Sequence, residues 1–274
     1  MNDTVAAALL GLIQGLTEFL PVSSTAHLIL GARALALDPE RFGLSFDVAL
    51  HLGTALAVLL YFHRTWLGLL RDLVRGRLTA PLLVLVGTLP AAVAGALLQS
   101  FVERELRGPL PIALGLVVGS LVFWLAERSQ ERRPASLDHG SGTEARSDLR
   151  STTVVDALVM GGAQAIALLP GISRSGITIS AGLGRGLARA HAARFSFLLA
   201  APIIVGAGAK TALDARHLAA LTAEPSTLAL GFTVSFLAGL AAIAFLMRFL
   251  RSRSFLWFVP YRLGLAALVL LGVL

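Results

Sequence analysis

Long apolar runs, separated by short stretches rich in arginine, set the pattern of this chain. Three runs contain no Asp, Glu, Lys or Arg: 78–102, 108–126 and 225–247. Three further apolar runs are shorter or charge-flanked: 46–62, 191–210 and 256–274. A helix needs about 20 mainly apolar residues to cross a bilayer. The pattern therefore predicts an all-α integral membrane protein with about six transmembrane helices.

Two further apolar stretches, 4–36 and 155–187, are interrupted near their middle by proline and by clusters of serine, threonine or glycine. Backbone that is not helical at membrane depth is tolerated only inside protein or beside a water-filled cavity. We therefore interpret each stretch as a re-entrant helix pair that enters and leaves the membrane on one side. The alternative is a single kinked crossing at each place.

The distribution of arginine separates these alternatives for the second stretch. If that stretch is re-entrant, four loops share one face of the membrane: 63–79, 127–153, 185–194 and 248–254. That face then carries fifteen arginines, against six basic residues on the opposite face. With a single crossing, the two faces carry eleven and ten. Basic residues gather on the cytoplasmic side, so the pattern favours the re-entrant pair, with the arginine-rich face in the cytoplasm.

The two halves of the chain repeat one arrangement. Residues 1–127 are expected to form a re-entrant pair followed by three spans, and residues 154–274 are expected to do the same. Because three is odd, the second half is inserted upside down relative to the first. This is the inverted-topology repeat of many transporters. The polar segment 128–153 is expected to be a flexible cytoplasmic linker with no fold of its own.

Composition agrees with a membrane protein and excludes several other classes. Apolar residues make up 56% of the chain and charged residues 14%, with a mean hydropathy of +0.79. A soluble domain carries roughly 25% charged residues. The net charge of +7 comes mostly from arginines between apolar runs, so we expect no nucleic-acid partner. The chain has no cysteine, which excludes disulfides and thiolate metal sites. Its first basic residue is Arg33, so a cleaved signal peptide is not expected.

The first interrupted stretch places ionisable groups at membrane depth. Gln14 and Glu18 are four residues apart and share a helix face, and Pro21 should end that helix. His27 follows on the next helix. Ionisable residues inside a bilayer line wet, protein-walled cavities, so we expect Glu18 and His27 to face such a cavity.

Three consecutive hydroxyls, Ser23, Ser24 and Thr25, stand between these groups. They can cap the second helix of the pair, where backbone N–H groups attract anions. A hydroxyl, a base and a carboxylate are the minimum for nucleophilic displacement at phosphorus. For the hydroxyls alone, a plain helix cap explains the pattern equally well. Together with Glu18 and His27, three residues beyond Ser24, they favour chemistry.

The second interrupted stretch supplies a fixed cation. Ser173, Arg174 and Ser175 follow Pro170 and Gly171. A buried arginine at a helix N-terminus, flanked by hydroxyls, suits the oxygens of a phosphate. The alternative is an arginine that extends to the membrane surface, but 17 uncharged residues precede Arg174, which favours the phosphate site.

Other ionisable groups also occur in apolar runs. Asp47 and His51 lie in the run 46–62, and Arg262 follows Tyr261. Each is close to a predicted membrane interface. Asp47 and Arg262 are therefore expected to support the site rather than to carry its chemistry.

The two polar segments resemble the signature segments of the undecaprenyl pyrophosphate phosphatase family, the bacitracin-resistance membrane proteins of bacteria. They read QGLTEFLPVSSTAH from Gln14 and LLPGISRSG from Leu168. The similarity extends over essentially the whole chain, including FDVALHLG from Phe46 and the pair Tyr261–Arg262. The resemblance implies an integral membrane enzyme that hydrolyses undecaprenyl pyrophosphate to undecaprenyl phosphate and inorganic phosphate. Such an enzyme recycles the lipid carrier of cell-wall synthesis and confers bacitracin resistance.

By the same resemblance, Ser24 is the expected nucleophile and His27 is its base or the acid for the leaving group. Glu18 is expected to be a metal ligand or proton relay. Arg174 is expected to hold the phosphate and to stabilise charge in the transition state. Five further residues are expected to contact the substrate: Ser23, Thr25, Ser173, Ser175 and Arg262.

The resemblance also implies a divalent cation, Mg²⁺ or Ca²⁺, held by Glu18 and Gln14. The family often has Glu at the first of these positions. Gln14 can still bind a metal through its oxygen, but it cannot act as a base.

Location and partners follow from the resemblance as well. We expect the bacterial plasma membrane, a site open to the outer face, and a polyprenyl pyrophosphate substrate among membrane lipids. Whether the protein forms a homodimer is left undecided by the sequence. A polyprenyl-phosphate flippase is the alternative function, because carriers also use inverted repeats. A carrier, however, needs no hydroxyl beside a base.

Overall fold

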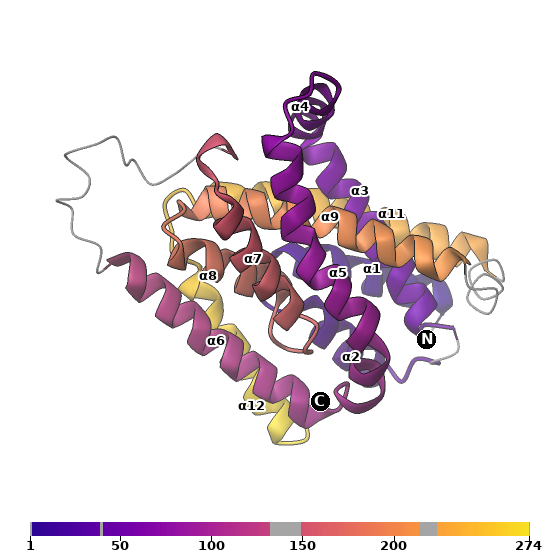
Figure 1. The fold of residues 1–274 in the computed structure, drawn as a ribbon. Helices are drawn as coiled ribbons and strands as arrows, with labels where there is room; N and C mark the ends of the chain where they lie inside the picture. Colours follow the sequence, from indigo (N-terminus) through magenta and orange to yellow (C-terminus); the bar gives the residue numbers. More distant parts are fainter. Residues whose placement is uncertain (1, 39–40, 132–148, 214–223, 274) are drawn as a thin grey trace.

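The computed structural model describes residues 2–38, 41–131, 149–213 and 224–273, and every regular element within them is helical (Figure 1). The first half contains α1 (Asp3–Phe19), α2 (Ser24–Ala34), α3 (Leu44–Tyr61), α4 (His63–Val74), α5 (Thr79–Glu105) and α6 (Pro109–Glu131). The second half contains α7 (Val154–Ile166), α8 (Arg174–Gly184), α9 (Arg189–Leu213), α11 (Pro225–Phe249) and α12 (Val259–Leu270). Two short 3₁₀ turns, η2 (Leu149–Ser151) and η3 (Phe255–Phe258), precede α7 and α12.

The expectation of an all-α membrane protein is confirmed by the lengths and composition of these helices. Within the described residues, α5, α6, α9 and α11 are each long and apolar enough to cross a bilayer. The predicted span 46–62 corresponds to α3, which has 18 residues and bends by 74° into α4. The predicted span 256–274 corresponds to η3 and α12, and α12 has only 12 residues. These two are the shortest of the six expected spans.

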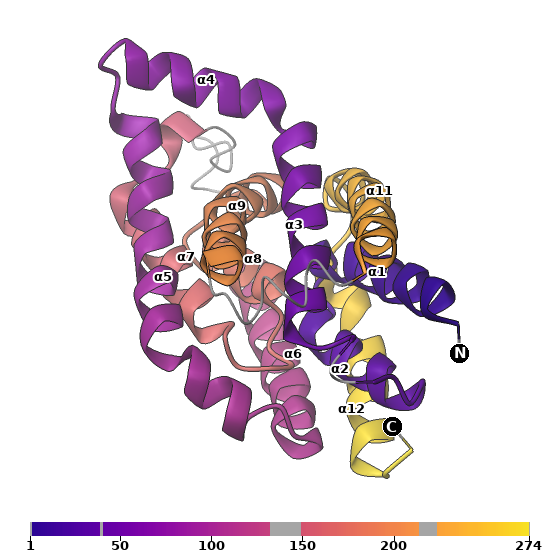
Figure 2. The same cartoon turned by 90° about the vertical axis from the view of Figure 1, so that its right-hand side faces the viewer.

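Helix α4 replaces a predicted loop. The arginines of 63–79 predict a connection between spans, whereas the structure has a helix over most of this segment. Leu67, Leu70 and Leu73 are at least half exposed on this helix, which projects at the top of Figures 1 and 2. An amphipathic helix with arginines and exposed leucines is typical of a membrane interface. An expectation based on uncharged runs misses such a helix because Arg64, Arg71 and Asp72 interrupt its apolar run.

Both interrupted stretches are broken helix pairs, as predicted. None of the four helices involved, α1, α2, α7 and α8, is longer than 17 residues, so none spans a bilayer alone. The residues before α2 and α8 have nearly the same unusual backbone, with φ of 75° at Ser23 and 76° at Ser173. Non-glycine residues rarely adopt positive φ, and such strain persists only where surrounding contacts impose it.

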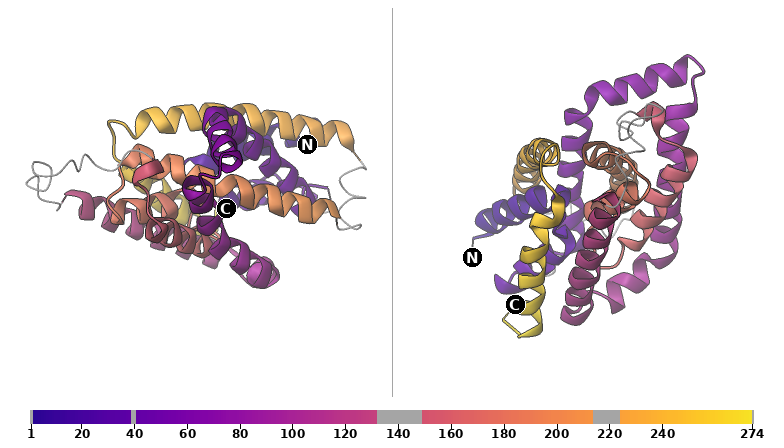
Figure 3. Two further views of the ribbon diagram at one scale, coloured as in Figure 1. Left: turned by 45° about the horizontal axis from the view of Figure 1, so that its top comes forward. Right: turned by 90° about the vertical axis from the view of Figure 1, so that its left-hand side faces the viewer.

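The contacts between helices are symmetric with respect to the two halves of the chain. Helix α1 packs along α11 and α7 packs along α5, while α3 contacts α11 and α9 contacts α5. Figure 2 shows α3 between α9 and α11, and Figure 3 shows α12 beside α6. If each helix of one half is replaced by its counterpart in the other half, the first pair becomes the second and the third becomes the fourth. The pairs α3 with α9 and α6 with α12 are unchanged. A two-fold relation between the halves produces this pattern, although the repeat boundaries near 127 and 154 stay a prediction.

Glycines bring the first helix of each half close to its partner. A Cβ atom at Gly11 or Gly15 would lie 2.6 Å from a backbone carbonyl oxygen of α11. In the same way, Gly161 of α7 lies against Gly87 of α5. Small residues four apart allow such close helix packing in membranes. The contact fixes the position of α1, which carries the polar residues of the first break.

Candidate active site at the two helix breaks

The two helix breaks lie against each other. Ser175, in the first turn of α8, donates a hydrogen bond to the carbonyl oxygen of Leu20 at 3.2 Å. Beside it, Arg174 Nη2 lies 2.5 Å from Glu18 Oε1. The breaks are about 150 residues apart in the sequence but form one polar site, which the inverted arrangement predicts.

Glu18 is the centre of this site. Its side chain is buried, and its Oε2 atom accepts hydrogen bonds from Ser24 Oγ at 2.6 Å and from Gln14 Nε2 at 3.0 Å. Its Oε1 atom pairs with Arg174. His51 Nε2 lies 3.5 Å from Oε2 on another side of the carboxylate. A short O–H···O⁻ bond is charge-assisted and strongly oriented, so Glu18 fixes the direction of the Ser24 hydroxyl. The same carboxylate also holds the Arg174 guanidinium.

His27 is placed differently from what the sequence predicts. Its Nδ1 atom lies 2.7 Å from the carbonyl oxygen of Ser23, and its Nε2 atom lies 2.6 Å from the hydroxyl of Tyr261. The two rings stack with an interplanar angle of 8°. The sequence pattern paired Ser24 with His27, whereas the structure bonds the Ser24 hydroxyl to Glu18. The ring of His27 turns away because the carbonyl oxygen one helical turn earlier binds its Nδ1.

The predicted residues of the second break surround the start of α8. Ser173 and Ser175 are both buried, and Ser173 Oγ accepts a hydrogen bond from the backbone N–H of Gly176 at 3.3 Å. Ser173 is thus a helix cap, the structural alternative considered for such hydroxyls. Arg174 Nη1 is buried and has no hydrogen-bond partner among the described residues. One guanidinium nitrogen therefore still has hydrogen-bonding capacity for a ligand.

Arg262 joins the two breaks from α12. It is fully buried, with Nη1 donating to the carbonyl oxygen of Pro21 at 3.2 Å and Nη2 donating to that of Gly171 at 2.9 Å. Its Nε donates to Ser120 Oγ at 3.0 Å, and its guanidinium lies over the ring of Phe123. The family resemblance implies that Arg262 contacts the substrate. The structure engages all three guanidinium nitrogens with protein oxygens, which makes Arg262 a clamp on both breaks.

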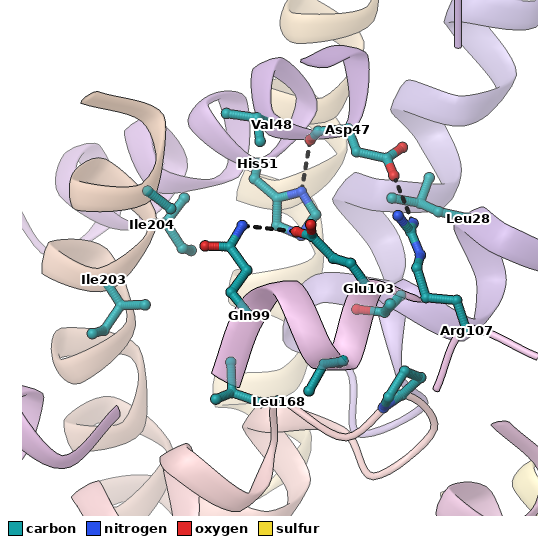
Figure 4. Close-up of a pocket in the computed structure, with 14 residues that line it drawn as sticks. Leu28, Asp47, Val48, His51, Gln99, Glu103, Arg107, Leu168, Ile203 and Ile204 are labelled. Atoms are coloured by element: carbon teal, nitrogen blue, oxygen red, sulfur yellow. Dashed lines mark hydrogen bonds and ion pairs between the residues drawn. The ribbon is translucent and has the colours of Figure 1, made fainter. Parts of the chain in front are cut away.

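A cavity of about 260 Å³ adjoins the site between α3, α5 and α9 (Figure 4). Arg107 and Asp47 pair at 3.3 Å on one side of it, and Gln99 donates to Glu103 at 2.8 Å on another. His51 lines the cavity and also faces Glu18, so it connects the two. Thr25, one of the predicted substrate contacts, lies on the cavity wall, which is otherwise largely apolar and includes Leu28, Val48, Leu168, Ile203 and Ile204.

Two residues at the site received no role from the sequence. His51 was noticed as an ionisable group in an apolar run, and its position four residues after Asp47 could have suggested that both face one cavity. Tyr261 was noticed only as part of a pair with Arg262. Because Tyr261 binds His27 from 234 positions away in the sequence, no local pattern points to the contact.

The oxygen atoms at Glu18 suit a divalent cation in part. No group of three or more His, Cys, Asp or Glu side chains that could hold a metal occurs among the described residues. However, Gln14 Oε1 is buried without a partner in the described part of the chain, on a side chain that contacts Glu18. Mg²⁺ is commonly held by one or two protein oxygens plus the oxygens of a phosphate substrate. Gln14 and Glu18 would fill that limited role with the Gln14 amide turned, because its Nε2 and not its oxygen faces Glu18 in this structure.

Comparison with known proteins places this geometry in a family. The model of the family described as bacitracin resistance protein BacA matches residues 7–268. The chain is 43% identical to an undecaprenyl-diphosphatase of Rubrobacter xylanophilus, over 98% of each chain. It is 42% identical to that of Trichlorobacter lovleyi, over 99% of this chain and 98% of the relative. It is 40% identical to undecaprenyl-diphosphatase 2 of Stutzerimonas stutzeri, over 98% and 97%. The chain therefore belongs to the bacitracin resistance protein BacA family.

Proposed function

We propose that this protein hydrolyses undecaprenyl pyrophosphate to undecaprenyl phosphate and inorganic phosphate. The family and the names of the relatives support this activity. The observation that carries it is the meeting of Ser24 and Arg174 on the single carboxylate of Glu18. The reaction recycles the lipid carrier of cell-wall synthesis, and it accounts for the bacitracin resistance after which the family is named.

Ser24 is suited to attack the terminal phosphorus. As its Oγ–P bond forms, the bond from that phosphorus to the bridging oxygen breaks, and undecaprenyl phosphate leaves. The proton of Ser24 passes to Glu18, whose Oε2 atom already accepts it in a hydrogen bond of 2.6 Å. Water then splits the Oγ–P bond, which releases inorganic phosphate and restores the hydroxyl.

Arg174 supplies fixed positive charge where the phosphoryl oxygens gain negative charge. In a buried site such a preoriented cation stabilises the transition state more than it would in water. His27 remains the predicted acid for the leaving group. A divalent cation held by Gln14 and Glu18 would add positive charge next to the same phosphoryl oxygens.

The lipid environment follows from the fold. The mostly apolar wall of the larger cavity suits the first isoprene units of the substrate, and His51 and Thr25 on that wall lead to the site. We infer that the protein lies in the bacterial plasma membrane with this site open to the outer face, as the family resemblance implies, and the arginine distribution indicates which loops are cytoplasmic. Membrane lipids and the polyprenyl pyrophosphate are its partners.

The direct test is release of inorganic phosphate from C55 pyrophosphate by the purified protein in detergent. The wild-type protein should release phosphate, and the Ser24→Ala variant should release almost none. A wild-type protein that releases none, but moves polyprenyl phosphate between the leaflets of liposomes, would instead establish the flippase.

The role of the carboxylate and amide in metal binding can be separated by exchanging them. Gln14→Glu adds a charged oxygen ligand, which divalent ions prefer. The Mg²⁺ concentration for half-maximal phosphate release should therefore fall, while kcat changes little. Glu18→Gln should reduce activity strongly, because it leaves two neutral amides on that helix face. Near-normal activity of Glu18→Gln at modest Mg²⁺ would show that Glu18 is neither ligand nor proton relay.

The orientation in the membrane can be tested by single-cysteine labelling, since the natural sequence has no cysteine. Ser252 follows α11 on the arginine-rich side, and Glu105 ends α5 on the opposite side; both are exposed. An impermeant maleimide should label Glu105→Cys in intact cells. It should label Ser252→Cys only after the membrane is permeabilised. The reverse result would invert the orientation.

A further inference from the structure

A second, smaller cavity lies beside Arg174. Its volume is about 90 Å³, and Arg174 and Gln164 are the polar residues that line it. The rest of its wall is apolar and comes from α5, α9 and the segment after α7. It shares Leu168, Ile203 and Ile204 with the larger cavity, so the two cavities adjoin. The smaller one can therefore be reached from the side on which the lipid substrate is proposed to bind.

This cavity brings together two polar atoms that lack partners. Arg174 Nη1 and Gln164 Oε1 are both buried without a hydrogen bond to any residue that the structure describes. Gln164 as a whole is only 3% exposed. Buried polar groups are nearly always hydrogen-bonded. A cationic donor and a neutral acceptor that remain unsatisfied at one cavity indicate a ligand that has both an acceptor and a donor.

The orientation of the Gln164 amide is set by its surroundings. Its Nε2 atom donates to the carbonyl oxygen of Leu199 at 3.4 Å. Exchanging the amide oxygen and nitrogen would place two acceptors against each other. The oxygen is therefore the atom left for the cavity, and the ligand must offer it an O–H or N–H group.

The charges around the cavity favour an anion of low charge as its ligand. In α1, the residue four positions after Gln14 is Glu18, whereas the residue four positions after Gln164 is Leu168, just beyond the end of α7. The second break thus lacks the carboxylate that accompanies the amide in the first. Of the described residues that line the cavity, Arg174 carries the one charge, and its Nη2 already pairs with Glu18. Low-dielectric surroundings strengthen the attraction of an anion to Nη1, but the nearby carboxylate and the cost of burying charge favour a protonated oxyanion over a fully ionised one.

We propose that this cavity binds a protonated phosphate group, and that it receives the inorganic phosphate product after its release from Ser24. Arg174 Nη1 donates to a phosphate oxygen, and Gln164 Oε1 accepts the P–OH hydrogen. A single water needs about 10–15 Å³ of such space, so the cavity holds a larger group. The identity of the ligand as a product rests on the proposed function, while the preference for a protonated oxyanion rests on the cavity alone.

Phosphate and sulfate provide the test, because phosphate keeps a proton near neutral pH and sulfate does not. Binding of each anion to the full-length wild-type protein in detergent is measured by thermal stabilisation, which requires no turnover. Phosphate should bind about tenfold more tightly than sulfate, as expected when one buried hydrogen bond is gained or lost. Gln164→Leu should abolish this preference. Gln130→Leu, which removes the same kind of side chain near the end of α6, should keep it.

The outcomes show separately whether the phosphate site or the proposed enzymatic activity is wrong. Equal binding of phosphate and sulfate to the wild-type protein, binding of neither, or a preference that persists in Gln164→Leu would overturn the site. Should Gln164→Leu fold poorly, Ala167→Val narrows the same cavity and should weaken phosphate binding. A protein that prefers phosphate but releases none from the lipid would retain the site and lose the proposed activity.

Discussion

Ser24→Ala, His27→Ala and Arg174→Ala should each lower kcat by about 100-fold or more. Losses of this size are expected when a nucleophile, an acid or base, or a charge stabiliser is removed. Ser24→Ala removes the hydroxyl that Glu18 orients at 2.6 Å, and Arg174→Ala removes the cation that lies 2.5 Å from the same carboxylate. Phosphate release at saturating lipid pyrophosphate measures kcat in each case.

Double variants identify which of these residues act as one unit. The hydrogen bond between Ser24 and Glu18 predicts that Ser24→Ala combined with Glu18→Gln is little worse than the poorer single variant. The sequence pattern predicts the same behaviour for Ser24 with His27, and the structure assigns the stronger coupling to Glu18. Losses that multiply fully in the Ser24 and Glu18 pair would show that the serine does not pass its proton to Glu18.

Arg262→Leu should destabilise the protein by about 3 kcal/mol or more, because hydrogen bonds from a charged donor contribute roughly 1.5–3 kcal/mol each. The variant leaves the carbonyl oxygens of Pro21 and Gly171 without their donor. Since these carbonyls belong to the breaks that position the site, kcat should fall while KM changes little. Thermal unfolding in detergent and steady-state kinetics measure the two effects.

A second variant weakens the contacts of Arg262 but keeps the arginine itself. Ser120→Ala deletes the hydroxyl that accepts from Arg262 Nε and donates to the carbonyl oxygen of Leu116, and it should cost about 1–3 kcal/mol. Arg262→Lys should retain part of the stability, because an ammonium can still donate to one break. A rise in KM with unchanged stability in Arg262→Leu would instead support the substrate contact that the sequence analysis assigned to this residue.

Local patterns in the sequence were sufficient to predict most of the helices and the two helix breaks. Uncharged runs mark α5, α6 and α11 because a bilayer excludes charge over the length of a span. Pro21 and Pro170 mark the two breaks because proline removes a backbone donor and ends a helix. Helix α4 was missed because Arg64, Arg71 and Asp72 interrupt its apolar run, so that its apolar face follows the helical period without forming an uncharged run.

The breaks could also be identified as the site, since ionisable groups at membrane depth are rarely structural. Glu18 and Arg174, singled out on this ground, do meet, although 156 positions separate them. The inverted repeat made that meeting an expectation. It could not assign hydrogen-bond partners, because these depend on distances of a few tenths of an ångström between side chains from different helices.

The sequence by itself determined the class of protein, the positions of its helices other than α4, and the two segments that carry its chemistry, because each depends on neighbours within a few turns. Only the tertiary structure decided that Ser24 bonds to Glu18, that His27 bonds to Tyr261, and that Arg262 clamps both breaks. The contact of Arg262 with Pro21 spans 241 positions. Contacts of this kind arise when packed helices leave a buried donor near one acceptor among several, and the geometry of the assembled helices makes that choice.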